Sequence, residues 1–142
     1  MNKKFKIFAI ILSLGFLAAG YLFFFVLNKD HPDFKNIDAD YIIEASILYH
    51  EFSSDPKKAQ LKYGGKMIHI TGKIDEIEKR DSLTIAVYVF SEGLFGDEGI
   101  RCTFLKSDAK MIQDVNDVTA IKGFCSGYNE TDVILEKCSM IN

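Results

Sequence analysis

The three cysteines, Cys102, Cys125 and Cys138, are the most reactive side chains of this 142-residue sequence. They form no CxxC pair, which is the spacing typical of dithiol redox motifs. Two interpretations remain open: redox-active thiols, or one structural disulfide that leaves a buried free cysteine. We favour the structural interpretation, because a free cysteine usually packs as a small apolar side chain.

Other groups that could support catalysis lack the required spacing. His31, His50 and His69 are scattered along the chain, whereas the ligands of a structural metal recur at short fixed intervals. The sequence contains no HExxH pair, no phosphate-binding glycine loop and no nucleophile elbow. We therefore predict a protein that is not an enzyme and that uses no metal or cofactor.

An apolar segment near the N-terminus predicts a membrane anchor. Residues 7–27 contain no charged side chain, and about 20 apolar residues span the hydrocarbon core of a bilayer. Residues 1–6 contain three lysines and no acidic residue, and such a basic flank stays in the cytoplasm. The apolar run is longer than that of a cleavable signal, so we expect an uncleaved anchor with an extracytoplasmic C-terminal part.

The part of the chain after the anchor is acidic. The whole chain has 17 basic and 20 acidic residues, and three lysines precede residue 28. The remainder therefore has 14 basic residues and a net charge of −6. Domains that bind nucleic acid through its phosphates usually carry a basic footprint, so the charge makes nucleic acid an unlikely partner.

The rest of the sequence divides into a linker, a helical lead-in and a series of strands. Polar residues 28–36 are typical of a linker. Residues 37–65 are predicted to be helical: apolar residues recur at helical spacing from Ile37 to Phe52, and Asp55-Pro56 begins a second helix. The period then changes to two, which predicts strands from residue 66 to a turn at 78–82, and at 83–90, 100–105, 117–128 and 132–141, with a short helix at 107–115.

Five strands with a helix between the third and the fourth follow the order of an OB-fold, a small and partly open barrel. We therefore predict a mainly β domain, a five-stranded OB-fold barrel over residues 66–142, preceded by the helices and the transmembrane segment. Gly72 and Gly123 occupy core-facing positions inside strands. We interpret both as structural glycines at tight bends of the barrel.

Several motifs occur in the order known from one bacterial family. They are Ile-x-Ile-Thr-Gly-x-Ile-x-x-Ile at 68–77, Ile-x-Cys-x-Phe at 100–104, Lys-Gly-x-Cys-x-Gly at 122–127 and Asp-Val-Ile-Leu-x-x-Cys at 132–138. Over residues 38–141 the sequence resembles the tRNA_anti-like family of OB-fold domains. The resemblance implies an anchored or exported protein of the cell envelope with no catalytic residues to carry over. The lipoprotein version has a lipid-accepting cysteine where this chain has Tyr21.

OB-folds usually bind ligands on the face of strands two and three. If alternate residues from Leu83 onward point into the core, Tyr88 and Phe90 point outward beside Arg101. Such aromatic residues next to an arginine could stack on bases. Phe95, in the glycine-rich loop predicted at 91–99, is a further candidate contact residue. The alternative, which we favour, is that the lead-in helices cover this surface.

The fold also restricts the cysteine pairings. Strands three and five are neighbours in an OB-fold, so Cys102 could meet Cys138. Cys125 is expected opposite Leu135 across the last hairpin, and a bridge to Cys138 would need a bulge. Both pairings remain open.

The leading functional hypothesis is a membrane-anchored, extracytoplasmic and non-catalytic OB-fold module that binds an envelope protein or a small ligand. One alternative is a nucleic-acid-binding OB-fold that uses the face of strands two and three. The other is a thiol-redox protein.

Overall fold

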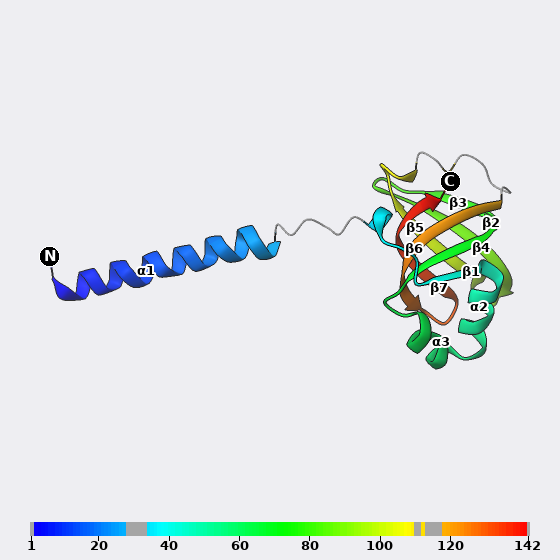
Figure 1. The fold of residues 1–142 in the computed structure, drawn as a ribbon, viewed down its shortest axis with the longest axis horizontal. Helices are drawn as coiled ribbons and strands as arrows, with labels where there is room; N and C mark the ends of the chain where they lie inside the picture. The colour runs from blue at the N-terminus through cyan, green and yellow to red at the C-terminus, as the bar shows by residue number, and fades with distance from the viewer. Residues whose placement is uncertain (1, 28–33, 110–111, 113–117, 142) are drawn as a thin grey trace. The chain divides into compact units, whose positions relative to one another are not determined.

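A computed structural model describes residues 2–27, 34–109, 112 and 118–141. The chain divides into two compact units, Met1–Pro32 and Asp33–Asn142 (Figure 1). Most of the predicted linker at 28–36 lies outside the described residues, as does most of the short helix predicted at 107–115.

The N-terminal unit is a single helical segment. Helix α1, Lys3–Leu22, continues as a π-helical turn, η1, over Phe23–Leu27. Within the described part of the chain, Lys3–Phe25 is the one helix long and apolar enough to cross a membrane, a criterion that an N-terminal signal sequence also meets. The helix has no acidic residue in its first turn and no side-chain cap. Such a helix is most stable where lipid leaves its backbone no other hydrogen-bond partner.

The described residues of the second unit are mainly β with helices, which confirms this part of the predicted fold class. Its elements in chain order are η2 (Phe34–Asn36), β1 (Tyr41–Glu44), α2 (Ala45–Ser54), α3 (Pro56–Tyr63), β2 (Met67–Lys73), β3 (Glu76–Lys79), β4 (Leu83–Gly93), β5 (Gly96–Leu105), β6 (Val118–Tyr128) and β7 (Asp132–Ile141).

All seven strands belong to one sheet with the order β1-β2-β6-β7-β5-β4-β3. The pairs β1–β2 and β5–β7 are parallel and the others are antiparallel. Strands β1 and β3 are the edges of this order, so the described sheet is open and has seven strands instead of the predicted five. One extra strand is β1, and another arises because the predicted first strand is divided into β2 and β3.

The helical lead-in begins later than the sequence predicted. Tyr41–Glu44 pair with β2 as a parallel strand, and the helix starts only at Ala45. Asp40 fixes this pairing, because its backbone N–H donates to the Met67 carbonyl (2.7 Å) and its carboxylate accepts from the Met67 N–H (2.8 Å). The run Tyr-Ile-Ile also favours a strand.

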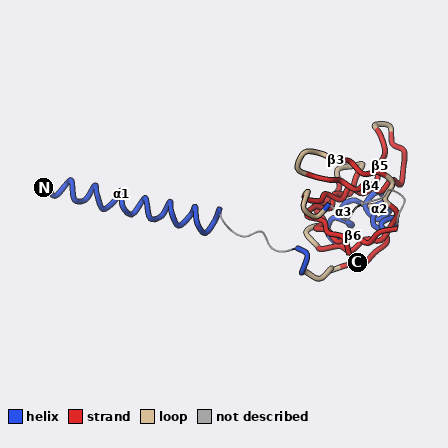
Figure 2. The backbone as a smooth tube through the Cα atoms, turned by 90° about the horizontal axis from the view of Figure 1, so that it is seen from above, coloured by secondary structure: helices blue, strands red, loops and turns tan. Residues whose placement is uncertain are grey.

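The second helix begins as predicted. Asp55 accepts a hydrogen bond from the Lys58 backbone N–H (3.1 Å) and Pro56 occupies the first turn, which is the expected arrangement at a helix start. Helix α2 contacts β1, β2, β4, β5 and β7, so it covers one end of the curled sheet (Figures 1 and 2). Of the residues predicted to bind a ligand, Phe90 contacts this helix through Tyr49.

The core lies between α2 and the inner face of the sheet. Each large apolar side chain buried there contributes about 1.5–3 kcal/mol to the stability of the fold, because it is removed from water. Six of the largest fully buried side chains are Leu48, Phe52, Ile68, Ile70, Phe104 and Leu135.

Both predicted structural glycines lie where a side chain would collide with a neighbour. A Cβ on Gly72 would lie 3.0 Å from the Ala45 Cβ and 3.1 Å from the Tyr88 Cε1. A Cβ on Gly123 would lie 2.5 Å from the Cys138 Sγ. Close packing thus explains the absence of side chains here, in addition to the change of direction between β2 and β3.

Candidate functional site

The structure contradicts the predicted orientation of Tyr88. This side chain is fully buried and shares a hydrogen bond of 3.0 Å with the Thr119 hydroxyl. Burial is the main cause that raises the pKa of its phenol. The ring packs against Gly72, whose missing side chain provides the space. Tyr88 is therefore a core residue, and bases cannot stack on it.

Arg101 and Thr103 point outward from β5, as predicted, on either side of the buried Cys102. Arg101 lies opposite Val87 of β4 and Thr103 lies opposite Ile85. On the outer face of β4 and β5, the cation Arg101 thus lies beside the apolar side chains of Val87 and Ile85.

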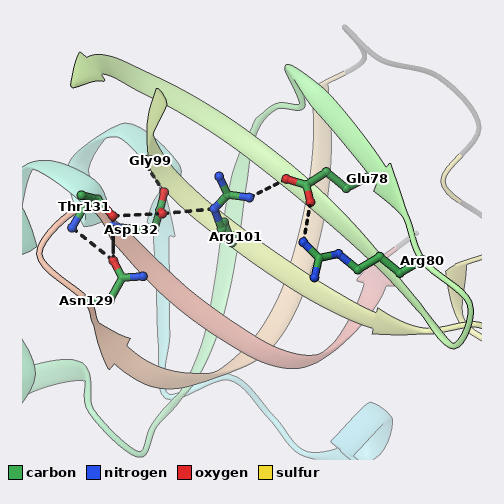
Figure 3. A network of polar contacts seen from close by, with 7 residues as sticks. All are labelled: Glu78, Arg80, Gly99, Arg101, Asn129, Thr131 and Asp132. Atoms are coloured by element: carbon green, nitrogen blue, oxygen red, sulfur yellow. Dashed lines mark hydrogen bonds and ion pairs between the residues drawn. The ribbon is translucent and has the colours of Figure 1, made fainter. Parts of the chain in front are cut away.

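Two carboxylates bind the Arg101 guanidinium (Figure 3). Its Nη1 donates to the Glu78 Oε1 of β3 at 2.5 Å, and its Nε donates to the Asp132 Oδ2 of β7 at 3.1 Å. Glu78 also accepts from the Arg80 Nη2 at 3.2 Å. We call Glu78, Arg80, Arg101 and Asp132 the Arg101 network. Its charges balance within it, so Arg101 has little capacity left for a phosphate.

The pKa of Glu78 reflects this arrangement. The hydrogen bond from Arg101 is the main cause that lowers the pKa of the Glu78 carboxyl below its ordinary value, while partial burial opposes the shift. Asp132 is 6% exposed, and besides Arg101 its carboxylate accepts from the Gly99 backbone N–H at 3.1 Å and from the Thr131 hydroxyl at 3.2 Å. The Arg101 network therefore connects strands β3, β5 and β7 through ion pairs.

The turn before β7 positions Asp132. The Asn129 Oδ1 accepts hydrogen bonds from the Thr131 backbone N–H (3.1 Å) and the Asp132 backbone N–H (2.7 Å). Glu130 adopts a positive φ of 80° between them. Such side-chain hydrogen bonds to the backbone are typical of asparagine in turns, and the turn lies between the strands predicted at 117–128 and 132–141.

Strands β4 and β5 extend through the region predicted as a loop at 91–99. Glu92 lies opposite Asp97 and Gly93 lies opposite Gly96, so that only Leu94 and Phe95 form the turn. We call residues 91–98 the β4–β5 hairpin. Both turn residues are 98% exposed, which is exceptional for large apolar side chains on one short segment.

The base of the hairpin is held by helix α2. The Tyr49 ring stacks on Phe90 with centroids 5.4 Å apart, and its hydroxyl donates to the Glu98 Oε2 at 3.1 Å. Burial and the contact with Glu98 raise the pKa of Tyr49 to about 12. Phe90, a predicted base-stacking residue, is 39% exposed and has an aromatic partner within the chain. Sequence analysis missed Tyr49, although it lies beside Leu48 on the apolar side of the predicted helix.

A cavity of about 410 Å³ lies beside Phe90. The start of α2, the end of β2 and Val118 of β6 form its other walls. Among the described residues of its lining, Lys73 is basic, and Glu44 and Asp75 are acidic. The mixed lining does not select a chemical class of ligand.

The three cysteines are all free thiols and all buried. Cys125 lies opposite Leu135, as predicted, and burial raises its pKa to about 11. Burial, followed by a hydrogen bond with Cys102, raises the pKa of Cys138 well above its ordinary value. Reactive cysteines are accessible and have a lowered pKa, so the arrangement does not favour a thiol-redox role. Among the described residues, no three His, Cys, Asp or Glu side chains cluster as metal ligands would.

Comparison with known proteins adds the following. One similar solved structure is that of a candidate nucleic acid-binding lipoprotein from Klebsiella pneumoniae subsp. pneumoniae, with 19% sequence identity and a TM-score of 0.58. The match covers 71% of this chain and 91% of that chain, and at this identity it shows the fold alone. No curated protein matches the chain significantly. The tRNA_anti-like family matches residues 1–140, and the chain therefore belongs to this family of OB-fold domains.

Proposed function

We propose that the chain is a membrane-tethered, non-catalytic module that binds another envelope protein through the β4–β5 hairpin. The observation that carries the proposal is the exposure of Leu94 and Phe95, 98% each, at the tip of a hairpin whose base is held by Tyr49. A rigid base and an unburied apolar tip suit insertion into a pocket of a partner protein.

The proposed topology follows the charges near the N-terminus. Residues 1–6 lie in the cytoplasm, residues 7–27 cross the membrane, and residues 28–36 connect to the extracytoplasmic part. Residues 37–65 and 66–142 form that part, in which β2 and β3 act as halves of the first strand of an OB-type barrel. The consecutive positions of β2 and β3 in the chain, with only Ile74 and Asp75 between them, support this assignment.

Several features make protein a better partner than nucleic acid. Arg101 is engaged by Glu78 and Asp132, so it offers little charge to a phosphate. The hairpin carries the exposed acidic residues Glu92 and Asp97 close to its tip. Residues 28–142 have a net charge of −6, which opposes the approach of a polyanion.

Nucleic-acid binding is the second candidate, and the described role of the Klebsiella protein motivates it. The partly exposed Phe90 would then provide a stacking surface next to the cavity, with Lys73 as the nearest cation. Purified full-length chain titrated with single-stranded DNA separates the candidates, because phosphate-mediated binding weakens steeply as salt rises. Binding at low salt that disappears at high salt would replace our proposal with this one.

Crosslinking in living cells tests the protein-binding proposal. A photo-reactive residue replaces Phe95 in the full-length chain, and a matched control replaces Leu105, which is the last residue of β5 and is 56% exposed. We expect one discrete protein adduct from position 95 and none from position 105. The same adduct should form when the captured protein carries the photo-reactive group instead. Equal products at both positions, or no adduct at position 95, would contradict the proposal.

A further inference from the structure

The β5–β7 pair is the junction between the two halves of the sheet. In the strand order, β1, β2, β6 and β7 lie on one side of this junction and β5, β4 and β3 lie on the other. The paired residues run only from Gly99 to Cys102 on β5 and from Asp132 to Leu135 on β7. A connection just beyond this short ladder would stabilise the whole sheet.

A bulge in β7 turns Cys138 toward this junction. Phe124 pairs with Glu136 and Lys122 pairs with Ser139, so Gly123 faces two residues of β7, Lys137 and Cys138. Lys137 has a φ of +52°, which few residues other than glycine adopt. After two exposed residues, Glu136 and Lys137, the bulge returns Cys138 to the core, where it is 2% exposed.

Gly123 leaves room for the Cys138 sulfur. A Cβ at position 123 would lie 2.5 Å from the Cys138 Sγ, closer than atoms of this kind approach each other. The sulfur also accepts a hydrogen bond from the Thr103 backbone, and its thiol contacts the thiol of Cys102. Three local features thus favour a contact between the Cys138 and Cys102 sulfurs. They are the bulge at Lys137, the absence of a side chain at Gly123, and the position of the Cys138 sulfur beside the Cys102 thiol and the Thr103 backbone.

We propose that Cys102 and Cys138 form a disulfide that joins β5 to β7, while Cys125 remains a thiol. The inference rests on the extracytoplasmic location proposed above, because disulfides persist in oxidising compartments. Cys125 lies elsewhere in the core, opposite Leu135, and has no cysteine among the groups that affect its pKa.

The chemistry is thiol–disulfide exchange. The Cys102 and Cys138 thiols together lose two protons and two electrons as the S–S bond forms, and an oxidised dithiol catalyst takes them up as its own disulfide becomes two thiols. Both sulfurs are buried in the folded domain. The exchange therefore takes place before β5 and β7 close, as the domain folds after export.

Tryptic mapping of the wild-type chain identifies the pair directly. Cleavage after Arg101, Lys106, Lys122 and Lys137 places each cysteine in a separate peptide. Full-length chain is purified without reductant, denatured, alkylated and digested. We expect the peptide 102–106 joined to the peptide 138–142, with Cys125 alkylated in the peptide 123–137.

Thiol counts with a mass-tagged maleimide provide the control. The wild-type chain should show one thiol before reduction and three after it. Cys125→Ala should show none before reduction, and Cys102→Ala should show two. The wild-type peptide map gives the answer even if a variant fails to fold.

Refolding in vitro separates this inference from the proposed location. Reduced full-length chain is refolded in detergent with oxidised glutathione and mapped in the same way. The 102–138 link in both experiments supports the pair. A 102–138 link in the refolded chain, together with three thiols in the chain purified from cells, would support the pair. The same result would overturn the extracytoplasmic location. Three thiols in both experiments, or a link that includes Cys125, would overturn the pair.

Discussion

The middle of strand β5 and the turn before this strand differ in the contacts that their side chains make. In the middle of the strand, Arg101 binds Glu78 and Asp132, and Glu78 in turn binds Arg80. In the turn before Gly96, the Leu94 and Phe95 side chains are almost entirely in water. One region has used its polar groups to connect three strands, whereas the other leaves apolar area unburied.

If the hairpin binds the partner, as proposed above, this chain uses a different surface from the usual ligand-binding face of an OB-fold. The outer face of β4 and β5 is where such folds usually bind ligands. Here ion pairs with Glu78 and Asp132 engage Arg101, a cation on this face. The extension of β4 and β5 as a hairpin supplies a new surface, of apolar character with acidic flanks.

The largest expected effect is the loss of partner capture when the hairpin tip becomes polar. The double substitution of Leu94→Ser and Phe95→Ser should reduce the yield of adduct, with the photo-reactive group placed at the exposed position Asp97, by about 30-fold or more, as removal of a binding hot spot does. The free energy of unfolding should change by less than about 0.5 kcal/mol, because neither side chain is buried. Leu105→Ser is the matched control and should leave capture unchanged.

The next effect concerns stability. Arg101→Met keeps an apolar side chain of similar length beside Val87 but removes the positive charge. The buried Asp132 carboxylate is then left with fewer hydrogen-bond partners. We expect a loss of about 2 kcal/mol in the free energy of unfolding, measured with urea. Arg80→Met removes the exposed cation of the network and should cost about 0.5 kcal/mol or less.

Partner capture should not change in Arg101→Met once the reduced stability is allowed for. A stable Arg101→Met protein that captures no partner would contradict the idea that the hairpin tip binds the partner without the Arg101 network. The binding surface would then include the outer face of β4 and β5.

The sequence predicts most of the fold because its periodic patterns are clear. Observed elements correspond to the change from a helical to a strand period at residue 66 and to the helix start at Asp55-Pro56. They also include a turn between the strands predicted at 117–128 and 132–141. Strand β7 was predicted with its observed limits, Asp132–Ile141. These features depend on local chemistry, which a sequence displays directly.

The errors occur where local patterns are ambiguous. Residues 83–90 are almost all apolar, so alternation could not show which face Tyr88 occupies. The answer depends on the space beside Gly72, on another strand. Likewise, Arg101 was identified as an outward residue, but its partners Glu78 and Asp132 come from strands whose pairing a sequence does not display.

A third prediction concerns the connection between α2 and the hairpin base. Tyr49→Phe keeps the ring that stacks on Phe90 but removes the hydroxyl that donates to Glu98. We expect a loss of about 1 kcal/mol and faster amide hydrogen exchange in residues 91–98. Unchanged exchange would mean that stacking alone holds the hairpin.

The pH dependence of the same contact has a defined direction. Folding raises the pKa of Tyr49 to about 12 from an ordinary value near 10. The stabilisation is therefore fully present below about pH 10 and is lost as the pH rises through the folded pKa. Tyr49→Phe should remove this component of alkaline unfolding.

The last expected effect is that of Glu78 on acid stability. Folding lowers the pKa of this carboxyl, chiefly through the hydrogen bond from Arg101. Its contribution is present above the ordinary pKa of about 4.3 and is lost as the pH falls through the lower folded value. Glu78→Gln should cost about 1 kcal/mol at pH 7 and should lessen the loss of stability between pH 5 and 3 by a similar amount. Glu76→Gln, at the exposed carboxylate on the same strand, is the matched control.

This last measurement bears directly on the nucleic-acid alternative. If Glu78→Gln and Glu76→Gln have the same acid dependence, the Arg101–Glu78 pair contributes little in solution. Arg101 would then be able to leave Glu78 for a phosphate, and the outer face of β4 and β5 would regain its ligand-binding capacity. If only Glu78→Gln changes the acid dependence, the network holds Arg101 at neutral pH. The hairpin tip is then the better place to look for the partner.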